Sequence, residues 1–213
     1  MEALVRSVGL KTNGVFQMDA GRRSGHSNAY FTGIGRTKRI VLFDTLLQNH
    51  SHDEILGVLA HELGHFKLKH VVKLFLLSQA VILAGLYLTY LAINWNLFYE
   101  TFGFDPTRFQ VALFFIGVFG QRVGFVFRPL FTGLSRRFET EADVFALRLL
   151  KNAQPLVAAL KKLTTENLAN LNPHPVYVWF NYSHPPVPER IHKLEVEAEG
   201  LPGPAGKHSG AYA

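Results

Sequence analysis

The apolar residues of this chain follow helical spacing in one stretch and form two long runs further on. Residues 55–66 have apolar positions every three or four residues, which is typical of a helix with one buried face. Ser51 and Glu54 fit a capping box just ahead of them, so we expect the helix to begin there. The apolar positions at this spacing are Ile55, Val58, Leu59 and Leu63.

Two long apolar runs predict a helical hairpin that crosses a membrane. We expect the first helix to continue without a break through residues 67–73 into residues 74–93, about 20 uncharged residues that suffice to cross a bilayer. Residues 94–106 interrupt the pattern, residues 109–127 form the second run, and residues 131–150 continue as a helix. A hairpin buried in the core of a soluble protein is the competing interpretation.

A short stretch of β-structure precedes the helices. Residues 27–32 and 39–43 are strand-like and predict a β-hairpin. Residues 28–31 could form an edge strand, and such a strand can bind an extended peptide by strand addition. A purely structural hairpin is the alternative. The predicted fold class is therefore a mainly α membrane protein with a small β-hairpin or sheet.

The remaining segments carry weaker patterns. Residues 1–25 contain turn signals and are expected to be irregular. Residues 155–170 and 189–199 predict two short helices, and the Gly- and Pro-rich residues 201–213 predict a disordered tail.

Composition and charge narrow the class of protein. The chain is 48% hydrophobic with a mean hydropathy of +0.11, and its net charge is +6, which suits either nucleic acid or a membrane surface. It contains no nucleic-acid-binding motif, so we expect a lipid bilayer and no nucleic acid as partner. The absence of cysteine excludes disulfides and thiolate ligands, so any metal must be held by histidine and carboxylate.

The motif H-E-x-x-H at residues 61–65 is the main candidate for chemistry. Two histidines four residues apart on a helix, His61 and His65, project from one face and can bind one zinc ion. Glu62 lies beside them and can take a proton from water on the metal. Gly64 costs about 1 kcal/mol in a helix interior, so we expect it to make room for another backbone.

A zinc site of this kind needs a third protein ligand, and the hairpin indicates which residue supplies it. Its two arms are each roughly 50–60 Å long at 1.5 Å per residue. Arms of similar length return Glu139 and Asp143 to the level of the two histidines. Glu139 is the predicted third ligand. Asp143, four residues on, is expected to accept the free ring N–H of a ligand histidine, whereas Glu141 should face elsewhere.

The other flanking residues receive structural roles. His70 is out of phase with His61 and is not expected to bind the metal, and His50 and His52 are expected to be exposed to solvent. Arg136 and Arg137 are expected to anchor the helix end by snorkelling. The positive-inside rule puts the zinc end in the cytoplasm, because basic residues cluster there: Lys67, Lys69, Lys73, Arg136 and Arg137.

Five segments, in order along residues 8–197, resemble the integral-membrane zinc CaaX prenyl proteases. Those segments are residues 27–31, 39–46, 61–65, 135–139 with Ala142 and Asp143, and 183–186 with Glu189 and Arg190. The resemblance implies a zincin-like endopeptidase with catalytic Glu62 and with Zn²⁺ bound by His61, His65 and Glu139.

The resemblance also implies roles that the residue pattern alone does not give. The strand with Asn28, Ala29 and Tyr30 would hold the substrate backbone, and Arg190 would lie close to the substrate. His184 would stabilise the oxyanion. By its spacing alone, His184 reads as an ordinary loop histidine.

These expectations define a domain organisation. Residues 1–70 hold the hairpin and zinc-binding helix, residues 71–135 the transmembrane hairpin, residues 136–199 the rest of the catalytic domain, and residues 200–213 the tail. Family members carry further membrane helices ahead of this region, so a missing N-terminal membrane half is an expected partner.

The expected function is zinc-dependent hydrolysis of a peptide or protein substrate at a membrane. The lack of cysteine and the small-residue tail favour a bacterial inner membrane, with the endoplasmic reticulum as the location in a eukaryote and the active site towards the cytoplasm in both. Two alternatives stay open: a quality-control metalloprotease that degrades misfolded membrane proteins, and a catalytically silent fragment or scaffold.

Overall fold

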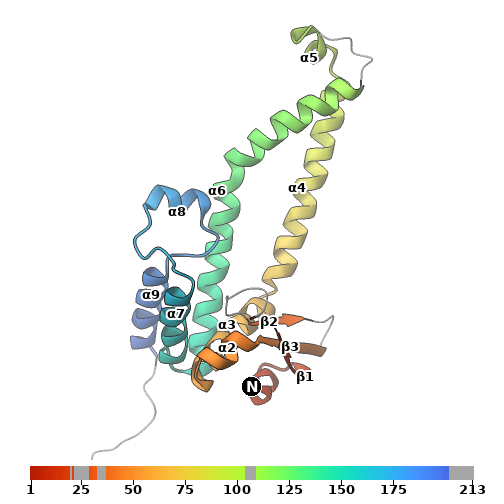
Figure 1. Cartoon of the computed structure of the whole chain (residues 1–213). Coiled ribbons are helices and arrows are strands. Elements are labelled where there is room, and N and C mark those ends of the chain that lie inside the picture. Colours follow the sequence, from red (N-terminus) through yellow and green to blue (C-terminus); the bar gives the residue numbers. More distant parts are fainter. Residues whose placement is uncertain (20, 22–28, 33–36, 104–108, 202–213) are drawn as a thin grey trace, which may run out of the picture. The chain divides into compact units, whose positions relative to one another are not determined.

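The chain divides into two compact units (Figure 1). The computed structural model describes residues 1–19, 21, 29–32, 37–103 and 109–201. Unit 1 comprises Met1–Leu68, Glu139–Pro173 and the segment from Pro185, and unit 2 comprises Lys69–Phe138 and His174–His184. Most of the predicted disordered tail, residues 202–213, lies outside the described residues.

Unit 1 contains a three-stranded sheet in the order β1-β3-β2 (Figure 1). β2 (Ala29–Thr32) pairs antiparallel with β3 (Thr37–Phe43), which confirms the predicted hairpin. β2 also lies at an edge of the described sheet, as expected. Asn28 lies outside the described residues.

The prediction that residues 1–25 are irregular is wrong. Glu2–Ser7 form helix α1, and Lys11–Met18 form β1, which runs parallel to β3. β1 is largely exposed and its register shifts between Thr12 and Val15, around a glycine with φ of +119°. A mostly exposed, irregular strand has little apolar alternation, so its pattern did not predict a strand.

Helix α3 (His52–Lys67) follows the short helix α2 (Asp44–Asn49) and begins where the sequence predicts. The Ser51 hydroxyl accepts a hydrogen bond from the Glu54 N–H at 3.3 Å, and the Glu54 carboxylate accepts one from the Ser51 N–H at 2.8 Å. This reciprocal pair is the capping box. It satisfies two backbone donors and fixes the starting point of the helix that carries residues 61–65.

Two glycines let α3 approach its neighbours closely. A Cβ on Gly57 would lie 2.7 Å from the backbone N of Leu156 in α7 (Gln154–Glu166), and one on Gly64 would lie 2.9 Å from Cα of Ala142 in α6 (Phe109–Leu150). The glycines are seven residues apart and share one face of α3. His61 lies between them on that face, so the close packing of backbones brings it against α6.

The predicted continuous helix from the H-E-x-x-H motif into the first apolar run is wrong. α3 ends at Lys67, and α4 (His70–Ile93) begins after Lys69, whose φ of +58° is left-handed. Non-glycine residues rarely adopt this conformation, and no Gly or Pro marks the break. The helical pattern runs on through it, so the sequence carried no signal for the interruption.

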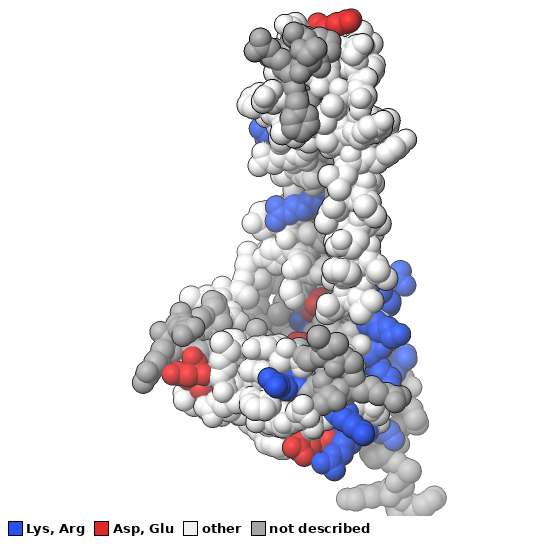
Figure 2. Space-filling model, turned by 90° about the vertical axis from the view of Figure 1, so that its right-hand side faces the viewer, with Lys and Arg blue, Asp and Glu red and all other residues white. Residues whose placement is uncertain are grey.

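Unit 2 is the predicted helical hairpin. His70–Ile93 and Leu113–Leu150 are both long and apolar enough to cross a membrane. In the apolar 18-residue stretch of each helix, 0% and 6% of the residues are buried. The core helices of a soluble protein are instead mostly buried. Figure 2 shows an almost uncharged surface over this helix pair, with few basic side chains. These features favour the membrane hairpin over the soluble-core alternative.

The two arms of the hairpin meet at their base. The rings of His70 and Phe138 stack at 4.3 Å, and Lys73 Nζ lies 5.4 Å from the centre of the Phe138 ring. The arms therefore return to the same level, as the count of residues along them predicts. The base therefore places Phe138 of α6 beside the beginning of α4.

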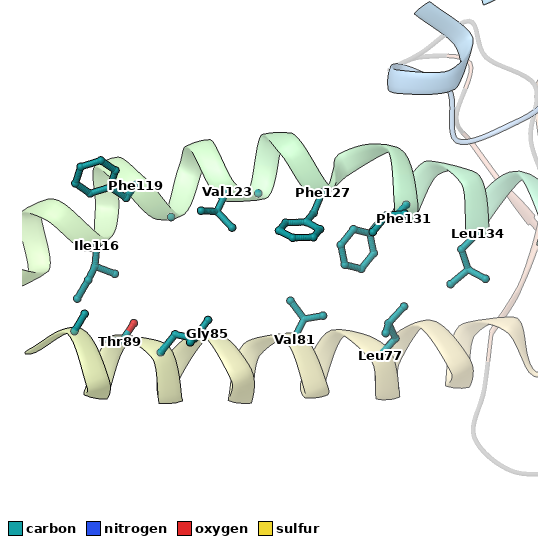
Figure 3. A pocket seen from close by; sticks show the side chains of 15 residues that line it. Leu77, Val81, Gly85, Thr89, Ile116, Phe119, Val123, Phe127, Phe131 and Leu134 are labelled. Atoms are coloured by element: carbon teal, nitrogen blue, oxygen red, sulfur yellow. The ribbon is translucent and has the colours of Figure 1, made fainter. Parts of the chain in front are cut away.

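Further along, α4 and α6 separate around an apolar groove of about 720 Å³ (Figure 3). Leu77 and Val81 face Phe127, Phe131 and Leu134 across it. Beyond the groove, the short helix α5 (Asn96–Thr101) follows α4.

The last two helices of the described residues are α8 (Pro175–Asn181) of unit 2 and α9 (Val187–Glu199) of unit 1. Arg136, expected to anchor the helix end by snorkelling, donates hydrogen bonds from its Nη1 to the Val178 and Tyr182 carbonyls of the α8 segment. Arg137 is exposed.

Candidate metal centre

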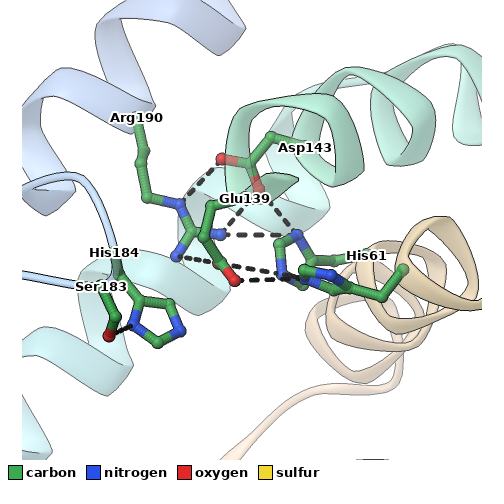
Figure 4. Close-up of polar contacts among 7 residues, drawn as sticks. His61, Glu139, Asp143, Ser183, His184 and Arg190 are labelled. Carbon is green, nitrogen blue, oxygen red and sulfur yellow. Dashed lines mark hydrogen bonds and ion pairs between the residues drawn. The ribbon is translucent and has the colours of Figure 1, made fainter. Parts of the chain in front are cut away.

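Three side chains of unit 1 bring ligand atoms together (Figure 4). His61 Nε2 lies 3.1 Å from His65 Nε2, and the Glu139 carboxylate lies 3.4 Å from the first and 3.3 Å from the second. α3 supplies both histidines and α6 supplies the carboxylate. His61 and Glu139 are buried and His65 is partly buried.

These spacings fit a zinc ion. A tetrahedral zinc with bonds of about 2.0–2.1 Å holds its ligand atoms about 3.3 Å apart. The three distances lie within a few tenths of an ångström of that value. Two imidazole nitrogens and a carboxylate are also the ligand types that zinc accepts in sites that keep one position open. The cluster confirms that the predicted residues converge.

Asp143 orients His61 from the opposite side of the ring. Its Oδ1 lies 2.8 Å from His61 Nδ1, so Nδ1 carries a proton and Nε2 is the nitrogen left to bind a metal. Arg190 holds Asp143 in turn, with Nε 2.8 Å from Oδ2 and Nη2 2.7 Å from Oδ1. A bidentate pair of this kind fixes the plane of the carboxylate.

The charged neighbours set the pKa of His61 in the metal-free protein. Burial lowers this pKa, but the hydrogen bonds to Asp143 and Glu139 outweigh burial and raise it to about 9. The metal-free cluster therefore binds a proton at neutral pH. For His61, His65 and Glu139 to hold a zinc ion, His61 would have to give up this proton, because a metal-ligand imidazole is neutral.

Glu62 is half-buried on α3 next to His61. Burial raises the pKa of its carboxyl, while the nearby histidines oppose the shift. A carboxylate with a raised pKa is a stronger base than an exposed one, which suits a residue that takes up a proton.

The residues expected to bind substrate are placed in different parts of the fold. Ala29 is buried in β2, and the partly exposed Tyr30 packs edge-on against Phe43 with its hydroxyl 3.8 Å from Met18 Sδ. Arg190 is buried, and two of its three nitrogens contact Asp143. Its Nη1 lies 3.8 Å from the Glu139 carboxylate.

His184 lies in the segment between α8 and α9 and belongs to unit 2. It is exposed, and its Nδ1 is 2.9 Å from the Ser183 hydroxyl (Figure 4). Its role at the substrate stays a prediction.

The prediction that His50 is exposed is wrong, whereas His52 is exposed as expected. His50 is buried, with Nδ1 3.3 Å from the Glu54 carboxylate and Nε2 3.5 Å from that of Glu166. The packing of α7 against the start of α3 encloses it, and a contact between segments more than 100 residues apart leaves no local pattern.

Sequence reasoning missed two features of the centre. One is the Asp143–Arg190 pair, which joins α6 to α9; only the resemblance had placed Arg190 near the site. The other is Gly57, whose spacing of seven residues from Gly64 was the available signal for a close helix contact.

Comparison with known proteins adds to this geometry. The profile of peptidase family M48 matches residues 1–198. The chain is 40% identical over 196 residues to the CAAX prenyl protease 1 homolog of Oryza sativa subsp. japonica, covering 92% of this chain and 46% of that protein. It is 39% identical over 217 residues to CAAX prenyl protease 1 of Saccharomyces cerevisiae, covering 93% and 47%.

The crystal structure of S. mikatae Ste24p matches with a TM-score of 0.80 and 34% identity, over 91% of this chain and 48% of that one. Homologues of this kind are integral membrane proteins. The chain spans about half the length of the relatives that it matches.

Proposed function

Since the chain belongs to peptidase family M48, we propose that it is a zinc-dependent endopeptidase that hydrolyses peptide bonds at a membrane. The observation that carries the proposal is the convergence of His61, His65 and Glu139, with ligand atoms 3.1–3.4 Å apart. Family membership alone would not show that the ligands of this particular chain are in place.

Each residue of the centre has a defined task. Zinc bound there supplies a Lewis acid and lowers the pKa of a bound water to about 7. Glu62 accepts the proton of the attacking water and returns it to the leaving amine. Asp143 keeps the proton of His61 on Nδ1, and Arg190 keeps Asp143 ionised and oriented.

The proposed substrate is a protein whose cleaved segment binds in an extended conformation. β2, with Ala29 and Tyr30, lies at an edge of the described sheet, where strand addition is possible. His184 donates a hydrogen bond to the carbonyl oxygen as it becomes negative. Arg190 acts mainly through Asp143. The relatives are CAAX prenyl proteases by name, so prenylated C-terminal peptides are the first substrate class to test.

The metal end of the hairpin is proposed to face the cytoplasm. Lys69, Lys73, Arg136 and Arg137 lie at the base of the hairpin, whereas Glu100 lies in the short helix that joins its arms. Basic residues are enriched on the cytoplasmic side of membrane helices. The membrane is the inner membrane in a bacterium or the endoplasmic reticulum in a eukaryote.

Two alternatives stand beside this proposal. The two apolar helices also suit a quality-control protease that takes unfolded membrane proteins. A catalytically silent scaffold is the alternative outside the enzymes.

One assay separates the proposed endopeptidase from the quality-control protease and from the silent scaffold. Cleavage of a farnesylated peptide and of an unfolded membrane protein is measured with the wild type, with Glu62→Gln and after chelation of zinc. Cleavage that Glu62→Gln abolishes while zinc content stays at one ion per chain supports the endopeptidase, and the preferred substrate separates the first two. Bound zinc with no cleavage of either substrate supports the scaffold.

A further inference from the structure

The C-terminal end of α8 is held by two side chains of α6. Arg136 Nη1 donates hydrogen bonds to the carbonyls of Val178 at 3.0 Å, Trp179 at 3.3 Å and Tyr182 at 2.7 Å. The Thr132 hydroxyl donates to the Trp179 carbonyl at 3.1 Å. All of these groups belong to unit 2.

α8 depends on such contacts. The last four carbonyls of any helix have no partner within the helix, and a cation there also interacts favourably with the helix dipole. α8 has only seven residues, and an isolated helix of that length is unstable in water. The Val178 carbonyl also accepts a hydrogen bond from the Tyr182 N–H at 3.0 Å, so Arg136 adds a second donor there and supplies donors to the Trp179 and Tyr182 carbonyls.

A third contact shows that the residues of α6 that contact α8 share one face of the helix. The rings of Phe125 and Phe180 are 4.6 Å apart. Phe125, Thr132 and Arg136 are spaced by seven and four residues, which puts them on one face of α6. The groove towards α4 is lined from the opposite face, by residues such as Phe127 and Leu134. The α8 contact is therefore separate from the packing of the hairpin.

We propose that Arg136 is a positioning residue for His184. The chain leaves α8 at Tyr182, whose carbonyl makes the shortest of the three bonds, and reaches His184 two residues later. Fixing that carbonyl limits where the His184 backbone can go. The planar guanidinium holds the two N–H bonds of Nη1 in fixed directions, whereas a lysine ammonium rotates about its flexible stem. The consequence for catalysis rests on the proposed function, in which His184 stabilises the oxyanion.

A double-mutant cycle tests the catalytic consequence. Arg136→Ala is expected to lower kcat about 10–100-fold, which does not exceed the loss of about 10²–10³-fold that removal of one oxyanion donor causes. KM and zinc content should be nearly unchanged. Arg136→Lys should be intermediate. Arg137→Ala, the exposed neighbour on the same helix, should stay within about twofold of wild type.

The decisive variant combines Arg136→Ala with His184→Ala. If Arg136 acts through His184, the double variant is no slower than His184→Ala alone, because residues that act as a unit are not additive. Losses that multiply, or an Arg136→Ala enzyme as fast as wild type, would overturn the proposal.

A second measurement does not depend on activity. Hydrogen exchange of the backbone amides in residues 178–184 should become faster in Arg136→Ala and remain unchanged in Arg137→Ala. Unchanged exchange in Arg136→Ala would refute the anchoring itself. A wild type that binds zinc but cleaves nothing would instead refute the proposed function, while the exchange result still decides whether Arg136 holds this segment.

Discussion

At the scale of single residues, His61 uses its two ring nitrogens for different purposes. Nε2 faces His65 and Glu139, and Nδ1 contacts Asp143 at 2.8 Å. The carboxylate of Asp143 is therefore part of the metal centre although it is not a ligand. Such partners of a ligand histidine fix its tautomer and raise its basicity.

Asp143→Asn keeps the shape of this partner and removes its charge. We expect zinc affinity to fall about 10–100-fold, because His61 Nδ1 loses its ionic partner and buried Arg190 loses the carboxylate with which it forms a bidentate pair. Competition titration with a zinc chelator measures the effect. Glu141→Gln, on the same helix, is the matched control, and an equal loss in that variant would show that Asp143 has no special role.

Glu62→Gln separates chemistry from metal binding. A general base contributes about 10²–10⁴-fold to the rate, so kcat should fall by that factor while the protein still binds one zinc ion per chain. The comparison of kcat with zinc content by elemental analysis checks this. Retention of full activity would remove Glu62 from the mechanism.

The same substitution should stabilise the metal-free protein at pH 7. Burial raises the pKa of Glu62 above its usual 4.5, so ionising it costs folding free energy, and that cost grows as the pH rises through the raised pKa. Below pH 4.5 the wild-type carboxyl is protonated in both states and the advantage of Gln should vanish. Thermal unfolding at several pH values shows whether the difference follows this course.

At the scale of secondary-structure elements, local patterns predicted some features and not others. The capping box at Ser51 and the length of the hairpin arms are properties of contiguous sequence, and both were predicted. The left-handed Lys69 carries no residue-type signal, and the buried position of His50 depends on Glu166 in a distant helix. Contacts of this kind are decided by tertiary packing and cannot be read from periodicity.

The contact of α3 with α6 makes Gly64 sensitive to substitution. A Cβ there would lie 2.9 Å from Cα and 3.1 Å from the carbonyl oxygen of Ala142. Gly64→Ala should destabilise the fold by about 1–3 kcal/mol through overpacking. It should also weaken zinc binding, because it separates the two histidines from Glu139. Denaturant unfolding and zinc titration measure the two effects.

Gly85→Ala is the matched control for this variant. Gly85 lies in α4, and a Cβ added there would meet no atom of the described residues within 4 Å, so alanine adds helix propensity without a clash. If both variants were equally destabilised, the close approach of α3 and α6 would not be the cause.

At the scale of the whole molecule, the account requires the two ends of the hairpin to lie on opposite sides of a membrane. The chain has no cysteine, so single cysteines can report sidedness. Glu100→Cys should react with an impermeant maleimide from outside intact cells or from the lumen of vesicles. Arg137→Cys should react only from the cytoplasmic side. The reversed pattern would contradict the proposed orientation.

The central claim is that His61, His65 and Glu139 bind one zinc ion. Zinc K-edge X-ray absorption of the purified protein tests it most directly. The account predicts one zinc per chain, coordinated by two imidazoles and oxygen donors at about 2.0–2.1 Å, with the zinc lost or its oxygen shell altered in Glu139→Gln. A spectrum without two imidazoles, or one that Glu139→Gln leaves unchanged, would contradict it.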